Sequence, residues 1–535
     1  MKFIALIAAL ALTAGCSQTT QPTSAEETPT KAAIELKVVD PWVKATKQGE
    51  MTAAFATLTN ESDQSVTIEK ASSDISMMVE LHEVVMKDGE MVMTPKEGGF
   101  EIKAGQSITL EPGGLHIMFM GVNKDLKPGD DVHVTLHFAG GGSQEIHALV
   151  KNFTGANEKY NKKKKRGCKC PPLGGGTSWV PPSVAAATPA ASPSVSQASV
   201  GSDSFIGFFG DRQAGVQTDA QQHLVLLGID LVHRDRETLA RLMRLISDDA
   251  SRLVYGSPAL ADTEPELAMN PARLSITVGW GPDIVHLLGH QLPAMPKFST
   301  DRLRPQWGQT DLLVQIGSDD LVSLSHAQRV LVKDLATLAK VTWTQRGFRD
   351  VAGAAGQSMR NLMGQVDGTV NPTTPQEFED LVWAGNTTQV VVRRIEIARD
   401  RWDLVDRAGR EFTIGRRLDN GAPLTGTRER DEPDFEATDA AGFPVIDAAS
   451  HMRRARGNAR GAQLLRRGYN YDDAEGAGLL FIAFAKDLQA QFVPMQRRLA
   501  ELDLLNRWIT TIGSAHYVVP PGAAQGSWIG ADELG

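Results

Sequence analysis

The sequence predicts a protein of two unlike domains, an all-β domain followed by a larger α+β domain. Short alternating patterns separated by turn residues fill residues 33–154, whereas strand patterns and amphipathic-helix patterns alternate through residues 204–535. The choice of basic residue changes at the same place: every basic residue before Arg166 is Lys, and only four Lys follow Lys169. A single domain has no physical reason for this change. We therefore expect a fusion of two segments of different ancestry.

The composition of the chain argues against several classes of protein. The chain has 535 residues, hydrophobic residues at 41% and charged residues at 22%, all ordinary for a soluble globular protein. A net charge of −9 argues against a nucleic-acid partner, because phosphate contacts need clustered Lys and Arg. Three Cys are too few for a disulfide scaffold.

The N-terminal residues have the pattern of an export signal. Phe3 to Leu12 form an apolar run that is too short to span a bilayer, and Thr13-Ala14-Gly15-Cys16 follows. This end resembles the lipobox of bacterial lipoproteins, in which the Cys is acylated; simple secretion is the alternative. The expectation is a signal peptide over residues 1–16 and a polar tether over residues 17–32. The protein is then exported to the periplasm or cell envelope and contacts the membrane only through a lipid anchor.

A second polar segment, residues 155–203, separates the two predicted domains. It begins with a Lys-rich run, Lys162 to Arg166, and continues as a Pro/Ala/Ser-rich stretch. Such a composition is typical of an extended linker.

The strand patterns of residues 33–154 favour a β-sandwich or a Greek-key barrel. Turn residues such as Pro112-Gly113-Gly114 and Gly140-Gly141-Gly142 separate the predicted strands. The strands are expected near residues 35–39, 53–58, 65–68 and 132–138.

Histidine and methionine carry the chemistry of the first domain. Nine of the 16 Met lie in the first 120 residues. His82 and Met93 flank one predicted hairpin, and His116 and Met118 share one face of the next strand. Thioethers select Cu(I) and imidazole suits copper, so a site of two His and two Met favours copper over zinc, calcium or magnesium. The alternative is that Met fills gaps in the core and His lies on the surface.

These residues resemble the motif of the periplasmic copper chaperones of the PCu(A)C type. The matching stretches include Asp40-Pro41-Trp42-Val43, Leu81-His82-Glu83 and Pro112 to Met118. The resemblance implies a cupredoxin-like Greek-key barrel. It also implies a Cu(I) site made by His82, Met93, His116 and Met118, from which the ion passes to an acceptor protein. His133, His137 and His147 do not match the motif and are interpreted as strand-surface residues.

The second domain is predicted to be a duplicated ferredoxin-like fold, because strands and helices alternate within two similar halves. Amphipathic helices are expected at residues 236–247, 323–338 and 492–508. Strands are expected near residues 224–229, 275–279, 311–316, 389–393 and 478–484.

Three polar clusters stand out in this domain. The first contains Gly364, Asp367 and Gly368, where Gly lets the backbone turn tightly beside a flat ligand and Asp367 can shuttle a proton. The second is His451, a candidate metal ligand. The third is the pair Arg466-Arg467, which can stabilise developing negative charge. Each cluster alone also has an ordinary interpretation: a turn, a hydrogen-bonded His and a pair of ion-pairing Arg.

Together the clusters resemble the dye-decolourising peroxidases, which are haem enzymes; the resemblance implies a duplicated ferredoxin-like fold that forms a dimeric α+β barrel. The resemblance runs from Phe208 to Gly522 and includes the Gly-x-x-Asp-Gly signature and Thr413-Ile414-Gly415-Arg416-Arg417. It implies haem b as the cofactor, His451 as the proximal iron ligand and Asp367 as the distal acid–base group. Arg466 is the expected distal Arg, although the short spacing from His451 leaves Arg467 open. Gly364, Gly368 and Arg416 are the other expected cofactor-binding residues.

The resemblance implies hydrogen peroxide as one substrate and bulky organic donors, such as dyes and phenols, or iron as the reductant. Trp343, Trp402 and Tyr471 are candidates to relay electrons from donors that cannot enter the pocket. An alternative is an iron-acquisition peroxidase or deferrochelatase acting on ferrous iron or haem. A third is a non-enzymatic metal-binding lipoprotein.

Overall fold

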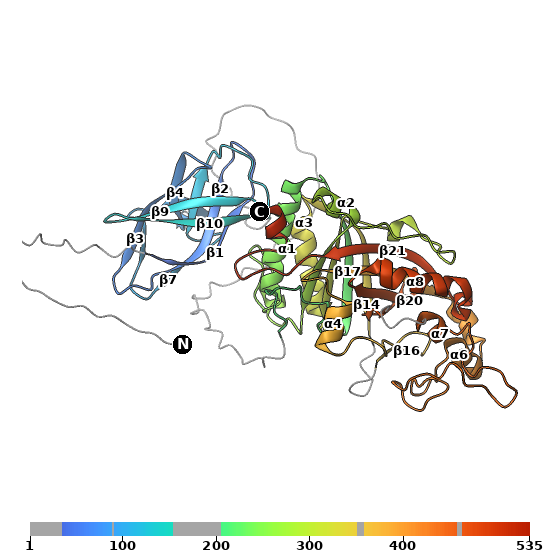
Figure 1. Cartoon of the computed structure of the whole chain (residues 1–535). Helices are drawn as coiled ribbons and strands as arrows, with labels where there is room; N and C mark the ends of the chain where they lie inside the picture. Colours follow the sequence, from blue (N-terminus) through green and yellow to red (C-terminus); the bar gives the residue numbers. More distant parts are fainter. Residues whose placement is uncertain (1–34, 88–89, 154–204, 350–357, 457–462) are drawn as a thin grey trace, which may run out of the picture.

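The computed structural model describes residues 35–87, 90–153, 205–349, 358–456 and 463–535. The predicted signal peptide, tether and linker lie outside these ranges. A small β domain lies beside a larger α+β domain (Figure 1). Within the described ranges, no helix combines the length and the apolar character needed to cross a membrane.

The first domain is one curved sheet around an apolar core. Its strands run in the order β5-β4-β8-β2-β1-β10-β9-β3-β6, with β7 paired to β2, and the β1–β10 pair is parallel. The four predicted strands are confirmed as β1, β2, β3 and β9, because alternating apolar residues bury one face of each strand. The strands are β1 (Lys37–Lys44), β2 (Thr52–Thr59), β3 (Val66–Ser73), β4 (Met78–Lys87), β5 (Glu90–Pro95), β6 (Phe100–Ile102), β7 (Ser107–Leu110), β8 (His116–Met120), β9 (Asp131–Phe138) and β10 (Ser143–Lys151).

The first half of the second domain is a complete ferredoxin-like unit. Its strands pair in the order β14-β11-β13-β12, and α1 and α3 make the two crossovers. Nearly every residue of β11, β12 and β13 is buried, as expected for central strands covered on both faces. The elements are β11 (His223–Leu231), α1 (Arg236–Leu253), a 3₁₀ turn (Pro265–Leu267), β12 (Ser275–Trp280), α2 (Pro282–Leu287), a 3₁₀ turn (Pro305–Trp307), β13 (Leu312–Ser318), α3 (Leu321–Leu335) and β14 (Ala339–Phe348).

The second half repeats this order with β21-β17-β20-β19, so the predicted duplication is confirmed. Pairing of β12 with β21 and of β14 with β19 joins the halves, and the pairing of β17 with β20 closes the sheet into a barrel. The elements are β17 (Thr388–Ile397), α5 (Arg399–Asp403), α6 (Arg407–Ile414), α7 (His451–Arg456), β18 (Leu465–Arg466), β19 (Tyr469–Asp473), β20 (Gly476–Ala485), α8 (Leu488–Leu502), η5 (Leu504–Arg507), β21 (Ile509–Val519) and α9 (Ala531–Leu534).

Two connections of the second half hold the polar clusters. The segment between β14 and β17 carries a small hairpin, β15 (Met359–Arg360) with β16 (Val366–Asp367), and then α4 (Pro375–Leu381). The segment between β17 and β19 carries α5, α6, α7 and β18 in place of a single crossover helix.

The predicted helix over residues 492–508 is wrong at its C-terminal end. Helix α8 ends at Leu502, because Asp503 leaves the helical conformation, with φ −72° and ψ 122°. The Asp503 carboxylate accepts a hydrogen bond from the backbone N–H of Leu505 and so starts the 3₁₀ helix η5. This break turns the side chain of Asp503 toward α7.

The two domains are in contact at the end of β10. The Lys151 side chain is fully buried, and its Nζ lies 2.5 Å from Asp249, 3.1 Å from Asp248 and 3.2 Å from Asp334, which belong to α1 and α3. Leu149 packs against the apolar core of the second domain. Figure 1 shows the β domain beside the α1 side of the larger domain.

Candidate functional sites

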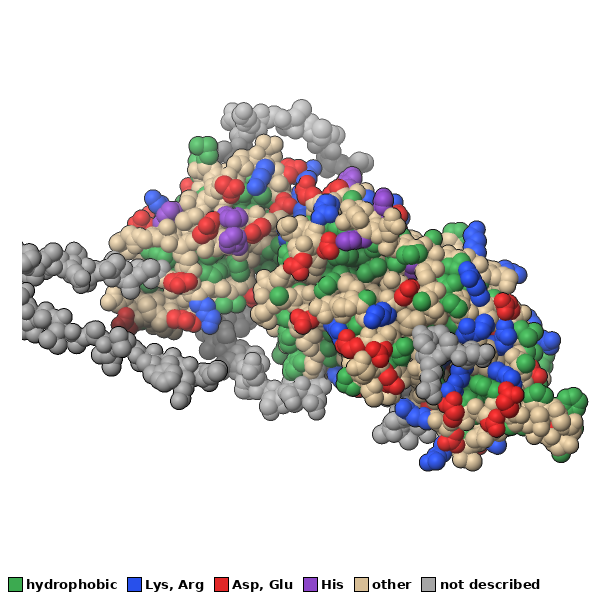
Figure 2. Space-filling model, viewed as in Figure 1, with side chains coloured by type: hydrophobic (Ala, Val, Ile, Leu, Met, Phe, Trp, Pro, Cys, Tyr) green, Lys and Arg blue, Asp and Glu red, His purple; other side chains and the backbone are tan. Residues whose placement is uncertain are grey.

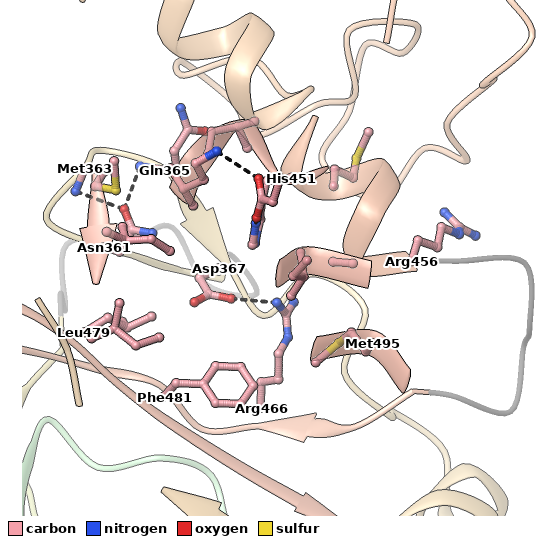
Figure 3. Close-up of a pocket in the computed structure, with 18 of the residues that line it drawn as sticks. Asn361, Met363, Gln365, Asp367, His451, Arg456, Arg466, Leu479, Phe481 and Met495 are labelled. Carbon is pink, nitrogen blue, oxygen red and sulfur yellow. Dashed lines mark hydrogen bonds and ion pairs between the residues drawn. The ribbon is translucent and has the colours of Figure 1, made fainter. Parts of the chain in front are cut away.

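The α+β domain encloses a cavity of about 400 Å³. Its volume falls within the range of roughly 300–1,000 Å³ that is usual for small-molecule and cofactor sites. His451, Asp367 and Arg466 all line it, so the fold brings together the three polar clusters of the sequence (Figure 3). Apolar side chains from β20 and α8 complete the wall, among them Leu479, Phe481 and Met495.

His451 is the first residue of α7 and is held in place by Asp503. Its Nδ1 lies 2.6 Å from the Asp503 carboxylate, which is itself buried. Because a carboxylate only accepts, Nδ1 carries the proton and Nε2 is the nitrogen available to a ligand in the cavity. Burial alone would lower the pKa of His451, but the charge and hydrogen bond of Asp503 outweigh it and raise the pKa. A His oriented by a carboxylate is the usual arrangement of a His that ligates a metal.

Asp367 and Arg466 form an ion pair within the cavity, with a separation of 3.1 Å. Asp367 comes from β16 and Arg466 from β18. Asn371 joins the two segments, because its amide group donates to the Arg466 carbonyl and accepts from the Arg466 N–H. Arg467 points elsewhere: its buried guanidinium donates to the carbonyl of Thr218 and to Gln221. Arg466 is therefore the Arg of this pair that lies in the cavity.

Of the remaining predicted cofactor-binding residues, the two Gly shape turns and Arg416 lines the cavity. Gly364 and Gly368 have φ of +81° and +101°, a region that favours Gly, so they shape the turns beside Asp367. The cavity wall at this place is made by Val366, Asp367 and Thr369.

Arg416 follows α6 and does line the cavity. Burial and the nearby charge of Arg466 lower its pKa to about 10. An anionic group bound in the cavity would relieve the repulsion between the positive charges of Arg416 and Arg466.

Sequence reasoning missed Asp503, because the predicted helix ran through it. An acidic residue before Leu504-Leu505 could have been recognised as a helix cap. Of the relay candidates, Trp343, Trp402 and Tyr471 are all buried rather than on the surface. Trp402 contacts the cavity wall, since its Nε1 donates to the carbonyl of Met363, a cavity residue.

The four His and Met residues of the first domain lie on one face of its sheet. His82 of β4 is directly opposite His116 of β8, and Met118 is opposite Glu80, two residues from His82. Met93 of β5 is opposite Val84, which is also two residues from His82. Opposite residues and residues two apart share a face, so the register brings all four together.

The two imidazoles of this face each present a free acceptor nitrogen. His82 Nε2 lies 2.8 Å from Glu80, and His116 Nδ1 lies 3.0 Å from the Gly114 carbonyl. Both partners only accept, so the lone pairs are on His82 Nδ1 and His116 Nε2. These two nitrogens are buried and have no hydrogen-bond partner among the described residues. Burial lowers the pKa of His116 and favours the neutral ring that ligates metals.

The second domain belongs to a recognisable class. It combines a duplicated ferredoxin-like barrel with a cavity lined by a carboxylate-oriented His and an Asp–Arg ion pair, groups that could hold a metal-containing cofactor. Residues 213–349 and 358–524 match the N-terminal and C-terminal domains of the Dyp-type peroxidases. The chain belongs to this family and is a peroxidase.

Individual relatives agree with this assignment. A dye-decolorizing peroxidase of Thermobifida fusca is 36% identical, over 60% of this chain and 83% of the relative. A deferrochelatase of Escherichia coli is 30% identical, over 59% of this chain and 84% of the relative. The crystal structure of a DyP-type peroxidase from Cellulomonas bogoriensis has 45% identity and a TM-score of 0.60, covering 62% of this chain and 98% of that one.

Haem is supported as the cofactor by a solved relative and by the cavity itself. DtpA from Streptomyces lividans, solved as an oxyferrous complex, is 36% identical with a TM-score of 0.59, covering 62% of this chain and 98% of that one. The cavity of this chain offers an oriented imidazole, apolar walls and the buried cation Arg416. Such a donor set fits a flat macrocycle that carries an axial iron and acidic side groups.

The first domain matches a different family. Residues 36–150 match the LpqE-like lipoproteins. This supports an exported protein and a β-rich lipoprotein domain in front of the peroxidase.

Proposed function

We propose that the α+β domain reduces hydrogen peroxide with haem b held through His451 Nε2. The observation that carries this proposal is the hydrogen bond from His451 Nδ1 to Asp503, which aims Nε2 into the cavity. When bound, haem would supply a redox-active iron for the reduction of peroxide. Arg416 would offer positive charge to its acidic side groups, and Gly364 and Gly368 would allow the turns that place Asp367 at the cavity.

Asp367 and Arg466 handle the protons and charge of peroxide cleavage. The Asp367 carboxylate takes the proton from one peroxide oxygen and delivers it to the other, so that water can leave. The Arg466 guanidinium is fixed 3.1 Å from Asp367 and stabilises the negative charge that develops as the O–O bond breaks.

The reductants are bulky organic donors such as dyes and phenols. The cavity is too small to hold a dye beside a cofactor, so these donors react at the surface. Trp402 is the relay candidate with the best contacts. It donates to Met363 at the cavity and packs against the half-exposed Trp508, with 5.1 Å between ring centroids.

The experiment that tests this mechanism is Asp367→Asn. The rate of the optical change that follows one equivalent of peroxide should fall by about 10²–10⁴-fold, the usual contribution of a general acid–base group. The haem content should not change. The matched control is Asp380→Asn, which removes an exposed carboxylate on α4. An unchanged rate in haem-loaded Asp367→Asn protein would remove Asp367 from the mechanism.

The similarity to a deferrochelatase favours a second candidate, in which the same domain serves iron acquisition by acting on ferrous iron or haem. Release of iron-free porphyrin from bound haem, or turnover stimulated by ferrous iron, would distinguish it from dye oxidation. Family membership makes the non-enzymatic alternative the weakest of the three.

For the first domain we propose Cu(I) binding by His82, Met93, His116 and Met118, with release to a copper acceptor protein. The two buried, unpartnered imidazole nitrogens support this proposal, because a neutral ring with an unsatisfied lone pair is costly unless a ligand satisfies it. The domain reaches the cell envelope through a lipid on Cys16.

Competition with a chromogenic Cu(I) chelator tests the copper site. Met93→Leu in the full chain should weaken Cu(I) binding at least tenfold, because a soft ligand is replaced by a hydrocarbon of similar size. Met51→Leu, at an exposed Met before β2, is the control and should bind like the parent chain. Equal Cu(I) affinity of the parent chain, Met93→Leu and Met51→Leu would exclude this set of copper ligands.

A further inference from the structure

A second group of histidines lies on the outer face of the β9–β10 pair. His133 of β9 is directly opposite His147 of β10, and Asp131 lies two residues before His133 on the same face. Figure 2 shows histidine and acidic side chains gathered on this part of the β domain. The three side chains are exposed. They are separated from the His82–His116 face by β2 and β1 in the sheet order.

The donor atoms of this group converge. Asp131 Oδ2 lies 3.0 Å from His147 Nδ1 and 3.8 Å from His133 Nε2. All three side chains offer ligand atoms within 4.8 Å of one another, and the two rings are 4.2 Å apart between centroids. Tetrahedral ligands at about 2.0–2.1 Å from a metal are about 3.3 Å apart, so small side-chain rotations, with loss of the proton that His147 Nδ1 donates to Asp131, would close the set around an ion.

Glu145 adds an independent feature. It lies on β10 next to this group, and its carboxylate is 2.9 Å from His133 Nδ1. Because the carboxylate accepts, Nδ1 is the protonated nitrogen and Nε2, the one nearer Asp131, is free to ligate. The pair repeats the carboxylate–histidine arrangement that orients metal ligands.

We propose that Asp131, His133 and His147 bind a divalent transition-metal ion such as Zn²⁺ or Cu²⁺. Two imidazoles exclude a calcium or magnesium site, which is built from oxygen ligands. The absence of a thioether or thiolate in the set separates it from the soft Cu(I) site proposed above. Solvent exposure leaves a fourth position for water. Cu²⁺ should bind more tightly than Zn²⁺, following the usual order of affinities.

The competing explanation is that these residues only make cross-strand ion pairs, which stabilise sheets modestly. The two explanations differ in what happens when one imidazole is removed. A metal site loses most of its affinity, whereas ion pairs alone bind no metal.

Equilibrium dialysis of the haem-loaded full chain against Zn²⁺ tests the proposal. The variants are His133→Asn and His147→Asn, and the matched control is His137→Asn. His137 lies on β9, on the same face as His133, and its side chain forms a hydrogen bond with Ser72 rather than with Asp131 or Glu145. The parent chain and the control should bind one more Zn²⁺ than either variant at micromolar concentrations, with at least a tenfold difference in affinity. Zinc that binds to other residues should bind equally to all four proteins, so it does not affect the difference between them.

Electron paramagnetic resonance of the Cu²⁺-loaded chain gives a second readout. Two coordinated imidazole nitrogens should split the signal, and His133→Asn should reduce that splitting to one nitrogen. Retained haem absorption and circular dichroism show that each variant is folded. The proposal is overturned if both variants bind Zn²⁺ like the parent chain, if the control loses the ion equally, or if no stoichiometric zinc is bound.

Discussion

Asp503 shows how a single residue prepares the haem cavity. Its two carboxylate oxygens have separate tasks, since Oδ1 accepts from the Leu505 N–H and Oδ2 accepts from His451 Nδ1. The side chain is buried, so its charge acts on the imidazole with little screening by water. The residue that ends α8 is thus also the one that orients the candidate iron ligand.

Replacement of Asp503 by Asn separates these two tasks. Asn keeps an oxygen for the cap and removes the negative charge next to His451. We expect haem affinity to fall by about 10–100-fold, the usual effect of losing a partner of a metal ligand, and the iron reduction potential to rise. Haem transfer to apomyoglobin and spectroelectrochemistry measure these two effects. If affinity and potential both match those of the parent protein, Asp503 does not act on the iron through His451.

The site shows which residues a sequence can identify and which need the fold. Asp367 and His451 could be proposed from the sequence, because the resemblance of the whole segment to a known family points to both. Asp503 could not, because its role depends on a helix end meeting another helix 52 residues away in sequence. The choice between Arg466 and Arg467 needed the fold, because the two adjacent side chains point to different places: Arg466 pairs with Asp367, and Arg467 donates to Thr218 and Gln221.

At the scale of the elements, short helices depend on their caps. Helix α4 has seven residues and begins with a capping box, in which Thr374 accepts from the Glu377 N–H and Glu377 accepts from the N–H of Thr374. Hydrogen bonds from the backbone N–H groups of Thr373 and Thr374 lower the pKa of Glu377 to about 2.

This low pKa predicts an acid-dependent contribution of α4 to stability. A carboxyl group with a depressed folded-state pKa stabilises the fold above its unfolded pKa, about 4.3, and loses this effect as the pH falls toward 2. Glu377→Gln should therefore lower the unfolding temperature of the peroxidase domain at pH 6, and the difference should shrink between pH 4.5 and pH 2. Calorimetry across this range measures it. A difference independent of pH would mean that charge at Glu377 is irrelevant.

The elements themselves were mostly predictable from periodicity, because most of them bury one face. Strand β14 was missed although its residues alternate, and β21 was missed although it begins directly after the region assigned to a helix. The barrel was implied only by the family resemblance; periodicity could not predict it, since the pairing of β17 with β20 depends on contacts between distant segments.

At the scale of the whole molecule, the two domains are joined by buried charge. Burial alone would lower the pKa of Lys151, but the charges of Asp249, Asp248 and Asp334 outweigh burial and raise it. The ammonium therefore stays protonated at neutral pH, and this contribution is lost only as the pH rises above the ordinary value for Lys, about 10.4. Arg252 extends the contact by pairing with both Asp248 and Asp40 of the β domain. Two domains that match different families thus share one interface of complementary charge.

Lys151→Met should separate the domains at neutral pH. It leaves Asp249 and Asp334 buried without their cation, and breaking such a pair typically costs about 3–5 kcal/mol. Small-angle X-ray scattering should show a larger radius of gyration, and the peroxidase domain should unfold at a lower temperature. Lys103→Met, at an exposed Lys in the same β domain, is the control. Adding Asp249→Asn and Asp334→Asn to the Lys151→Met chain should restore part of the lost stability, because the uncompensated charges are removed. Identical scattering curves for the Lys151→Met and Lys103→Met chains would show that this cluster does not hold the domains together.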